Sequence, residues 1–509
     1  MRQSMPEHFD VLIVGAGISG IGAACHLGMM CPSRTYAILE GRPDLGGTWD
    51  LFRYPGVRSD SDMHTLGFRF KPWTAAKSIA DGPSILRYLR ETATEFGVDR
   101  HIRFRHMVRK AAWSSDDARW TVEAVRQDTG ATVTFTCGFL FMGSGYYNYQ
   151  NGHLPEFPGR DRFQGQVVHP QAWPKDLDYT GKRVVVIGSG ATAMTLVPAM
   201  AKTAGHVTML QRSPTYVFAM PDTDVIANAL RKVLPERLAY RITRWKNTTL
   251  QQFIYWRSRV APAKVKKGLL KIVRRELGPD YDVEKHFTPS YNPWDQRLCL
   301  VPNGDLFEAI NSGKASVATD TIATWDERGI RTTSGEHLDA DLIVTATGLN
   351  ILTLGGVTFT VDGIPVDFAT TWSYKGFAFS DMPNLASAFG YINASWTLRA
   401  DLIAEYVCRL LNHMAKTGTD QCTPRLRPSD QEMVARPWIE NFSSGYVQRA
   451  IDQMPRQGDR EPWLNPQNFR RDRKMFRHSP LDDGVMRFTR TRAAGPRAAL
   501  PVPAPAAVR

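Results

Sequence analysis

The stretch V-L-I-V-G-A-G-I-S-G, residues 11–20, joins an apolar strand to the start of a helix through three glycines. Gly15 permits a tight turn, Gly17 lets the backbone approach a pyrophosphate, and Gly20 lets the helix pack on the strand. The free N–H groups and the dipole at the helix N-terminus then favour binding of phosphates. This pattern predicts a Rossmann-like dinucleotide-binding module at the start of the chain.

The residues that follow this module predict which dinucleotide it binds. A second strand, residues 36–39, ends in Glu40. A carboxylate at this place accepts hydrogen bonds from a ribose diol and repels a 2′-phosphate, so the site suits FAD or NAD and disfavours NADP. The glycine pair of G-G-T-W, residues 46–49, indicates backbone close to the same cofactor, which adds Gly47, Thr48 and Trp49 to the candidate site.

A second module repeats the pattern with one informative exchange. V-V-V-I-G-S-G-A-T-A, residues 184–193, is a G-x-G-x-x-A variant, and the next strand ends in Arg212 and Ser213 instead of an acid. Arginine at this place binds the 2′-phosphate of NADP through charge-assisted hydrogen bonds, whereas an incidental surface arginine is the alternative. We therefore expect FAD in the first site and NADPH in the second. The candidate NADP-binding residues are Gly188, Ser189, Gly190, Ala191, Thr192, Arg212 and Ser213.

The length of 509 residues exceeds what one hydrophobic core supports, so we expect several domains. The predicted fold class is α/β, with two Rossmann-like, three-layer dinucleotide-binding domains and a helical insertion. No apolar run approaches the ~18 residues of a membrane span, and the first apolar run ends at Gly15 as a strand, so we expect a cytoplasmic protein. The predicted parts are an FAD-binding domain (1–150 and 376–489), an NADP-binding domain (151–224 and 291–375, with a linker at 163–174), a basic helical insertion (225–290) and a disordered tail (490–509).

The formal net charge of +13 is concentrated between residues 231 and 275, where apolar residues interleave with the basic ones at helical spacing. A helical insertion with a solvated basic face is the interpretation we favour. Peripheral contact with an anionic membrane is the alternative, because basic amphipathic helices bind such surfaces. Nothing in the chain resembles a nucleic-acid-binding signature, and the six cysteines form no C-x-x-C pair, which disfavours a metal site and a dithiol mechanism.

A chain that binds FAD and NADPH without redox cysteines needs a second electron acceptor, and molecular oxygen is the simplest. Two longer motifs agree with a monooxygenase. F-x-G-x-x-x-H-x-x-x-W-P is matched by Phe163, Gly165, His169, Trp173 and Pro174. G-G-x-W-x-x-x-x-Y-P-G-x-x-x-D is matched by Gly46, Gly47, Trp49, Tyr54, Pro55, Gly56 and Asp60.

With these motifs the chain resembles the type I Baeyer–Villiger monooxygenases, which are class B flavoprotein monooxygenases, and especially their ethionamide-activating branch. Related enzymes of S- and N-oxidation typically carry Tyr or Phe where Trp173 stands. The resemblance implies that NADPH reduces the flavin and that one oxygen of O2 enters next to a ketone carbonyl, giving an ester via a C4a-peroxyflavin. It also implies oxidation of sulfides and thioamides.

The resemblance further implies roles for single residues. Arg297 matches the arginine that stabilises the anionic flavin species, and Asp60 matches the aspartate that positions it. Gln296 stands where the family usually has lysine, which places NADPH selectivity more heavily on Arg212. His169 is either a proton carrier or, as we prefer, a linker residue that couples domain rotation to the position of NADP⁺. Trp396 is either a pocket residue or an ordinary core tryptophan.

Two other functions stay open on the sequence. One is a flavin monooxygenase mainly of sulfur or nitrogen oxidation, and the other is a non-oxygenating NADPH-dependent flavoprotein reductase. Product analysis on ketones and sulfides distinguishes sulfur or nitrogen oxidation from Baeyer–Villiger oxygenation. The stoichiometry of NADPH, oxygen and product distinguishes a reductase from a monooxygenase.

Overall fold

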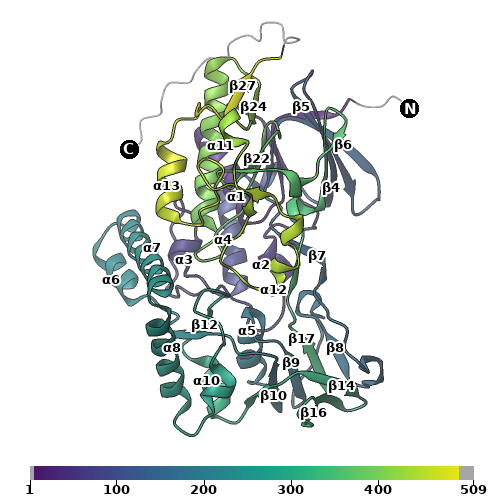
Figure 1. The fold of residues 1–509 in the computed structure, drawn as a ribbon, viewed down its shortest axis with the longest axis vertical. Coiled ribbons are helices and arrows are strands. Elements are labelled where there is room, and N and C mark those ends of the chain that lie inside the picture. The colour runs from purple at the N-terminus through teal and green to yellow at the C-terminus, as the bar shows by residue number, and fades with distance from the viewer. Residues whose placement is uncertain (1–4, 492–509) are drawn as a thin grey trace.

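The structure is a computed structural model that describes residues 5–491. Two sheets lie at opposite ends of the molecule, the first at the top of Figure 1 and the second at the bottom. The α/β fold with two dinucleotide-binding sheets is therefore confirmed. Residues 492–509, most of the predicted disordered tail, lie outside the described residues.

The first sheet has nine strands in the order β20-β19-β4-β5-β6-β1-β2-β3, with β23 also paired to β6. Strand β1 runs parallel to β2 and β6, so Val14, Leu39 and Met142 lie side by side where these strands end. The core of β1 is fully buried because V-L-I-V is apolar on both faces. The strands are β1 (Glu7–Val14), β2 (Tyr36–Leu39), β3 (Ile102–Arg103), β4 (His106–Ser114), β5 (Arg119–Arg126), β6 (Thr132–Met142), β19 (Thr358–Val361), β20 (Ile364–Pro365) and β23 (Leu385–Ser387).

Helices α1 (Ile18–Met30), α4 (Gly82–Glu95) and α11 (Thr397–Thr417) pack in one hydrophobic cluster with residues of β1 and β2. The second sheet is parallel throughout, in the order β13-β10-β9-β17-β8. Its strands are β8 (Gln166–Val168), β9 (Arg183–Ile187), β10 (His206–Gln211), β13 (Ala315–Thr319) and β17 (Leu342–Thr345). Helices α5 (Ala191–Met200) and α10 (Asp305–Asn311) pack against it.

The chain passes between the sheets through an antiparallel pair, β7 (Tyr147–Gly152) with β18 (Leu349–Ile351). This crossing corrects one predicted boundary. Residues 358–365 were expected in the NADP-binding part (291–375), yet they form β19 and β20, which extend the first sheet beside β4. The physical reason is that Phe359 is buried against Trp120 in the core of that sheet.

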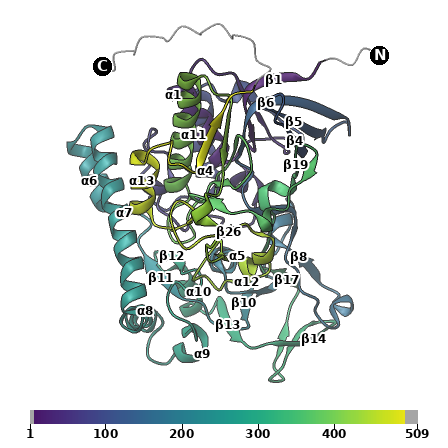
Figure 2. The same cartoon turned by 45° about the horizontal axis from the view of Figure 1, so that its top comes forward.

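The predicted basic insertion forms four helices along one edge of the molecule, visible at the left of Figures 1 and 2. They are α6 (Val225–Val233), α7 (Glu236–Val260), α8 (Pro262–Leu277) and α9 (Val283–Phe287). The favoured expectation of a solvated basic face is incomplete, because large apolar side chains such as Trp245 and Phe253 are also exposed there. Within residues 5–491, no helix combines the length and the apolar character that crossing a bilayer requires.

Smaller elements complete the described part of the chain. Short strands and helices after α11 close over the first sheet and its helices, and a small antiparallel sheet flanks the second one. The short helices include α2 (Thr48–Leu51), α3 (Met63–Leu66), α12 (Gly445–Gln448) and α13 (Phe469–His478).

Candidate active site between two dinucleotide-binding loops

One cavity of about 1150 Å³ lies between the two sheets and is lined by both glycine-rich loops. The loop after β1 contributes Gly15 and Gly17, and the loop after β9 contributes Gly188 and Gly190. The carboxyl ends of the parallel strands carry these loops, and ligands of α/β sheets bind at such ends. The cavity is thus placed where two dinucleotides could face one another.

The first loop is closely packed behind the cavity. At Gly15 the backbone has φ +97°, and a Cβ there would lie 2.8 Å from the carbonyl oxygen of Gly143. A Cβ on Gly20 would lie 1.9 Å from the carbonyl oxygen of Gly15. Helix α1 can therefore lie this close to its strand only because residue 20 is a glycine. Gly20 supports the turn from behind and does not line the cavity.

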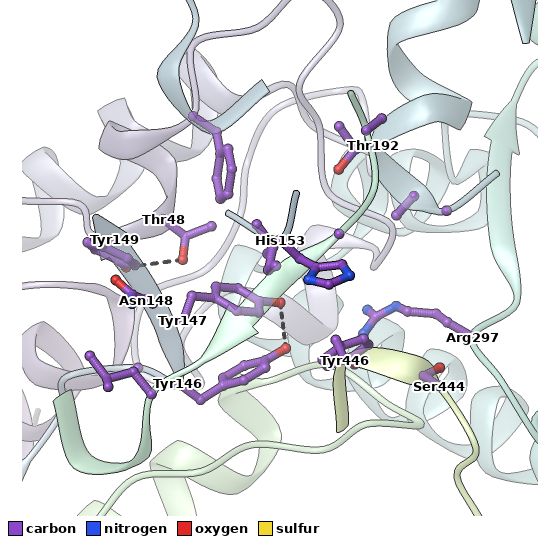
Figure 3. Close-up of a pocket in the computed structure, with 18 of the residues that line it drawn as sticks. Thr48, Tyr146, Tyr147, Asn148, Tyr149, His153, Thr192, Arg297, Ser444 and Tyr446 are labelled. Atoms are coloured by element: carbon purple, nitrogen blue, oxygen red, sulfur yellow. Dashed lines mark hydrogen bonds between the residues drawn. The ribbon is translucent and has the colours of Figure 1, made fainter. Parts of the chain in front are cut away.

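A second glycine pair covers the first loop from the other side. Gly47 adopts φ +55°, and a Cβ on it would lie 3.1 Å from the Cα of Gly17. Thr48 and Trp49 begin α2 and line the cavity. The hydroxyl groups of Thr48 and Tyr149 lie 3.4 Å apart, at the left of Figure 3. The first loop is therefore enclosed by a lid of backbone.

Glu40 stands at the end of β2 and lines the cavity, with 6% of its surface exposed. Its carboxylate accepts the N–H of Ala16 at 2.7 Å and that of Arg42 at 2.8 Å. Burial raises the pKa of Glu40, and these two backbone donors oppose the rise. The carboxylate is thus fixed at the edge of the first loop, where the sequence predicts contact with a ribose.

The second loop is built alike but stays open. Gly188 adopts φ +126°, with its Cβ direction blocked 2.4 Å away by the carbonyl oxygen of Ala346, whereas a Cβ on Gly190 would meet nothing within 4 Å. Ser189 Oγ donates to the carbonyl of Ser213 at 3.1 Å. Ala191 and Thr192 open α5, whose first turn carries no acidic residue and no side-chain cap. Its N–H groups are therefore available to an anion.

Arg212 follows β10 and is exposed at the same cavity. Among residues 5–491 no carboxylate forms an ion pair with it, so its guanidinium is available for a phosphate. Ser213 and Gln296 line the cavity as well. The structure therefore brings together all the residues proposed for NADP binding.

Arg297 and Asp60 form an ion pair that faces this cavity. Nε of Arg297 donates to Oδ2 of Asp60 at 2.7 Å, and its Nη2 lies 2.6 Å from the same oxygen. The charge of Asp60 raises the pKa of Arg297, so the guanidinium keeps its proton at any working pH. The pair thus provides a permanent positive charge at the junction of the two loops.

Three tyrosines beside this pair were missed by the sequence reasoning. The hydroxyl groups of Tyr146 and Tyr147 lie 2.5 Å apart, and Tyr446 of α12 lies close by (Figure 3). Burial raises the pKa of all three, so their hydroxyl groups stay protonated. A signal existed for the first two, because they stand four and five residues after the end of β6, which runs parallel to β1 and ends at the same edge.

His153 is a further residue that the sequence reasoning missed. Its imidazole and the guanidinium of Arg297 point into the same part of the cavity (Figure 3). Burial lowers the pKa of His153, and the positive charge of Arg449 adds to the effect. A neutral imidazole therefore faces the cationic side chain.

Trp396 lines the cavity and is also tied into the first module. Its Nε1 donates to Oγ of Ser19 at 2.7 Å, and its ring stacks on Tyr146 with centroids 5.1 Å apart. Trp396 thus has features of both a pocket residue and a core tryptophan, because it is half-buried by its neighbours and also lines the cavity.

The linker residues lie outside the cavity. Phe163 is buried edge-on against Trp325, and Gly165 leaves room for the Phe163 ring, which a Cβ would meet at 2.4 Å. Trp173 packs edge-on against Tyr179, and Pro174 is exposed. These residues hold the edge of the second sheet and make no contact with the candidate reaction site.

His169, at the end of β8, covers Gly152 of β7, where an added Cβ would meet its ring at 2.0 Å. Its Nδ1 accepts the N–H of Gln171 at 3.2 Å, and the Gln171 side chain donates to the carbonyl of Asn148 at 2.8 Å. Burial lowers its pKa. His169 therefore joins the second sheet to the crossing strand instead of pointing at a substrate.

The residues present fit the two cofactors that the sequence predicts. The open Cβ direction at Gly190 and the uncapped first turns of α1 and α5 leave room and N–H donors for two pyrophosphates. Glu40 suits a ribose and Arg212 a 2′-phosphate. FAD would be held by the loop of Gly15 and Gly17, and NADPH by the loop of Gly188 and Gly190.

Comparison with known proteins agrees with this geometry. A family model described as flavin-binding monooxygenase-like matches residues 79–264, and one described as an NAD(P)-binding Rossmann-like domain matches residues 13–81. The chain is 55% identical over 487 residues to the FAD-containing monooxygenase EthA of Mycobacterium tuberculosis, covering 96% of this chain and 99% of that protein. It is 53% identical over 491 residues to EthA of Mycolicibacterium smegmatis, with coverage of 96% and 99%.

Solved structures share the fold at lower identity. A steroid monooxygenase bound to NADP superposes with a TM-score of 0.74 at 22% identity, covering 95% of this chain and 99% of that one. Cyclohexanone monooxygenase from Rhodococcus sp. Phi1, bound to NADP⁺, gives a TM-score of 0.67 at 22% identity, with coverage of 84% and 88%. Two glycine-rich loops on one cavity, with relatives this similar over nearly their whole length, place the protein: the chain belongs to the family of FAD-containing, flavin-binding monooxygenases.

Proposed function

We propose that this protein is an NADPH-dependent monooxygenase that inserts one oxygen atom next to a ketone carbonyl and also oxidises sulfides and thioamides. The overall reaction converts ketone, O2, NADPH and H⁺ into ester, NADP⁺ and water. The observation that carries the proposal is the Arg297–Asp60 ion pair, which faces the one cavity that both nucleotide loops line.

FAD, when bound, supplies the chemistry that passes the electrons of NADPH to oxygen. The chain contributes a fixed cation beside that chemistry. Arg297 cannot give up its proton, so it stabilises negative charge without acting as an acid. Asp60 orients the guanidinium through two donors on one oxygen and offsets the cost of desolvating it.

The tyrosines next to this cation give the cavity polar donors in an aromatic wall. The hydroxyl groups of Tyr146 and Tyr147 are protonated and directly paired, so one of them is free to donate to a carbonyl oxygen. Tyr146 stacks on Trp396, and Phe389 packs against both at a tilt, with ring centroids 5.1–5.3 Å apart. A small apolar substrate with one polar oxygen or sulfur suits such a wall.

The test uses purified, FAD-loaded protein with NADPH, a methyl ketone and an aryl methyl sulfide, followed by mass-spectrometric identification of products. We expect an ester from the ketone, with NADPH and O2 consumed in equal amounts. Sulfoxide without ester would make sulfur oxidation the main activity. NADPH oxidation with hydrogen peroxide as the only product would overturn the proposal in favour of a non-oxygenating flavoprotein.

A further inference from the structure

Large apolar side chains project from the outward sides of α6 and α7. Trp245 is 68% exposed, Phe253 55% and Trp256 53%. Within residues 5–491, every exposed tryptophan and phenylalanine lies on this surface. Contiguous exposed apolar surface of this kind marks an interaction site. We call it the α6–α7 outer face, and it comprises Val225, Ile226, Val233, Leu238, Ile242, Trp245, Phe253, Trp256 and Val260.

Six exposed apolar residues of α7 lie three, four or eight positions apart and therefore share one side of the helix as a stripe interrupted at Thr249: Leu238, Ile242, Trp245, Phe253, Trp256 and Val260. Leu250 and Ile254 are also exposed and lie beside this stripe. The opposite side of α7, including Tyr240, Thr243 and Asn247, is buried against the rest of the molecule. The stripe thus points away from the protein, along the outer edge that Figures 1 and 2 show for α6 and α7. No part of the chain between residues 5 and 491 covers it.

Basic side chains without acidic partners lie on the same two helices and on α8, which follows α7. Lys246 and Arg259 of α7 are paired with Asp224 and Asp295. Arg244 of α7 and Arg274 and Arg275 of α8 are paired as well. Six further cations of α6, α7 and α8 form no ion pair with any carboxylate among the described residues 5–491. They are Lys232, Arg237, Arg241, Lys264, Lys267 and Lys271. The outer face therefore combines an apolar centre with unneutralised positive flanks.

This charge pattern decides between two occupants. A second copy docked symmetrically would bring the same basic flanks together, and Glu236 is the only acid within α7 to relieve the repulsion. An anionic bilayer accepts apolar and aromatic side chains at its interface and attracts lysine and arginine around them. We propose that the α6–α7 outer face is a docking surface for membranes that contain anionic phospholipid.

The inner side of α7 connects this surface to the candidate active site. Asn247 and Gln251 donate to the two carboxylate oxygens of Asp62 at 3.0 and 2.8 Å, two residues after Asp60. At the other end, Arg259 pairs with Asp295 at 2.7 Å, two residues before Arg297. One helix thus contacts the bilayer on one side and both loops of the ion pair on the other. Docking would hold the cavity next to apolar molecules dissolved in the lipid.

The experiment is co-sedimentation of FAD-loaded protein with vesicles of phosphatidylcholine, alone or mixed equally with phosphatidylglycerol. We expect binding to the mixed vesicles and little to the neutral ones. Trp245→Ala/Phe253→Ala/Trp256→Ala should lose most of the binding. Lys264→Ala/Lys267→Ala/Lys271→Ala should weaken it by about fivefold per lysine at low salt, and by less at high salt. Ile364→Ala/Val434→Ala, which removes exposed apolar side chains elsewhere, should bind like the unaltered protein.

The FAD content and the NADPH oxidation rate of each variant check that the fold is intact, since none of these residues lines the cavity. The proposal is overturned if the unaltered protein does not co-sediment with the mixed vesicles. It is also overturned if the aromatic triple variant binds them as well as the unaltered protein does. A dimer in analytical ultracentrifugation that the aromatic substitutions dissociate, without vesicle binding, would assign the face to a second copy and overturn it too. Because the readout is binding, failure here leaves the proposed oxygenation untouched.

Discussion

The two dinucleotide loops begin alike and end differently. Gly17 and Gly190 cap their helices with nearly the same backbone, φ −80° with ψ −173° and φ −80° with ψ −177°. Around Gly17 the chain adds a second glycine loop at Gly47, whereas the space beside Gly190 is empty. An enclosed loop suits a cofactor that stays, and an open loop suits one that is exchanged in each turnover.

The same contrast runs through the third position of each motif. Gly20 has no room for a Cβ, because α1 presses on the turn of Gly15, while Ala193 carries its Cβ fully buried in the second module. The charged residues that end the following strands differ in burial in the same way, since Glu40 is buried and Arg212 is exposed. The first module is built tightly and the second loosely.

The largest effect should come from the tight module. Gly20→Ala places a methyl group 1.9 Å from the carbonyl oxygen of Gly15, which forces α1 off its strand. We expect no FAD-loaded protein, measured as the ratio of flavin to protein absorbance after purification. Ala193→Gly is the matched control in the loose module and should keep its flavin. Normal flavin content in Gly20→Ala would show that the two modules do not differ in tightness.

The next largest effect should fall where the modules meet. Arg297→Ala removes the cation from the cavity, and we expect oxygenated product to fall about 10²–10³-fold, as when a charge-stabilising donor is lost. Flavin content and flavin reduction by NADPH should persist, because neither glycine loop is altered. Stopped-flow reduction and product analysis separate the two steps. Undiminished ester formation would remove Arg297 from the proposed mechanism.

A smaller effect is expected from the loose module. Arg212→Ala should raise KM for NADPH about 10- to 150-fold, the loss of one charged hydrogen bond of ~1.5–3 kcal/mol, with little change for NADH. Steady-state rates with both coenzymes measure the difference. Ser213→Ala keeps the charge and serves as control. An equal loss for NADH and NADPH would mean that Arg212 does not bind the 2′-phosphate.

The fold could be predicted from the sequence because its information is local. A strand, a glycine turn and a helix in G-A-G-I-S-G specify one βαβ unit, and Glu40 or Arg212 lies at a fixed place after it. Residues 358–365 were misplaced because a four-residue strand such as β19 carries no mark of its sheet. Only the packing of Phe359 on Trp120 assigns it.

The site was predictable only in part for the same reason. Asp60 and Arg297 are far apart in the chain, and family motifs, not spacing, indicated the pair that the structure places at 2.7 Å. Tyr446 belongs to a four-residue helix in an irregular region and had no local pattern. Likewise, helical periodicity revealed that α7 is amphipathic but not that its apolar stripe faces outward. The orientation of α7 depends on the contact of its polar side, through Asn247, with the loop of Asp62, which is distant in the sequence.

The smallest effect should come from the connection between the two modules. His169→Ala removes the ring that covers Gly152 and the acceptor for the Gln171 N–H, so the loose module loses one fixed contact with the crossing strand. We expect the yield of product per NADPH to fall roughly two- to tenfold, the size of one hydrogen bond of about 0.5–1.5 kcal/mol, with flavin content unchanged. Hydrogen peroxide released per NADPH measures the lost coupling. Gln171→Ala cuts the neighbouring link to Asn148 and should act in the same direction, more weakly. If His169→Ala instead sheds FAD while the remaining holoenzyme stays fully coupled, the residue supports the tight module and the assignment to the connection is wrong.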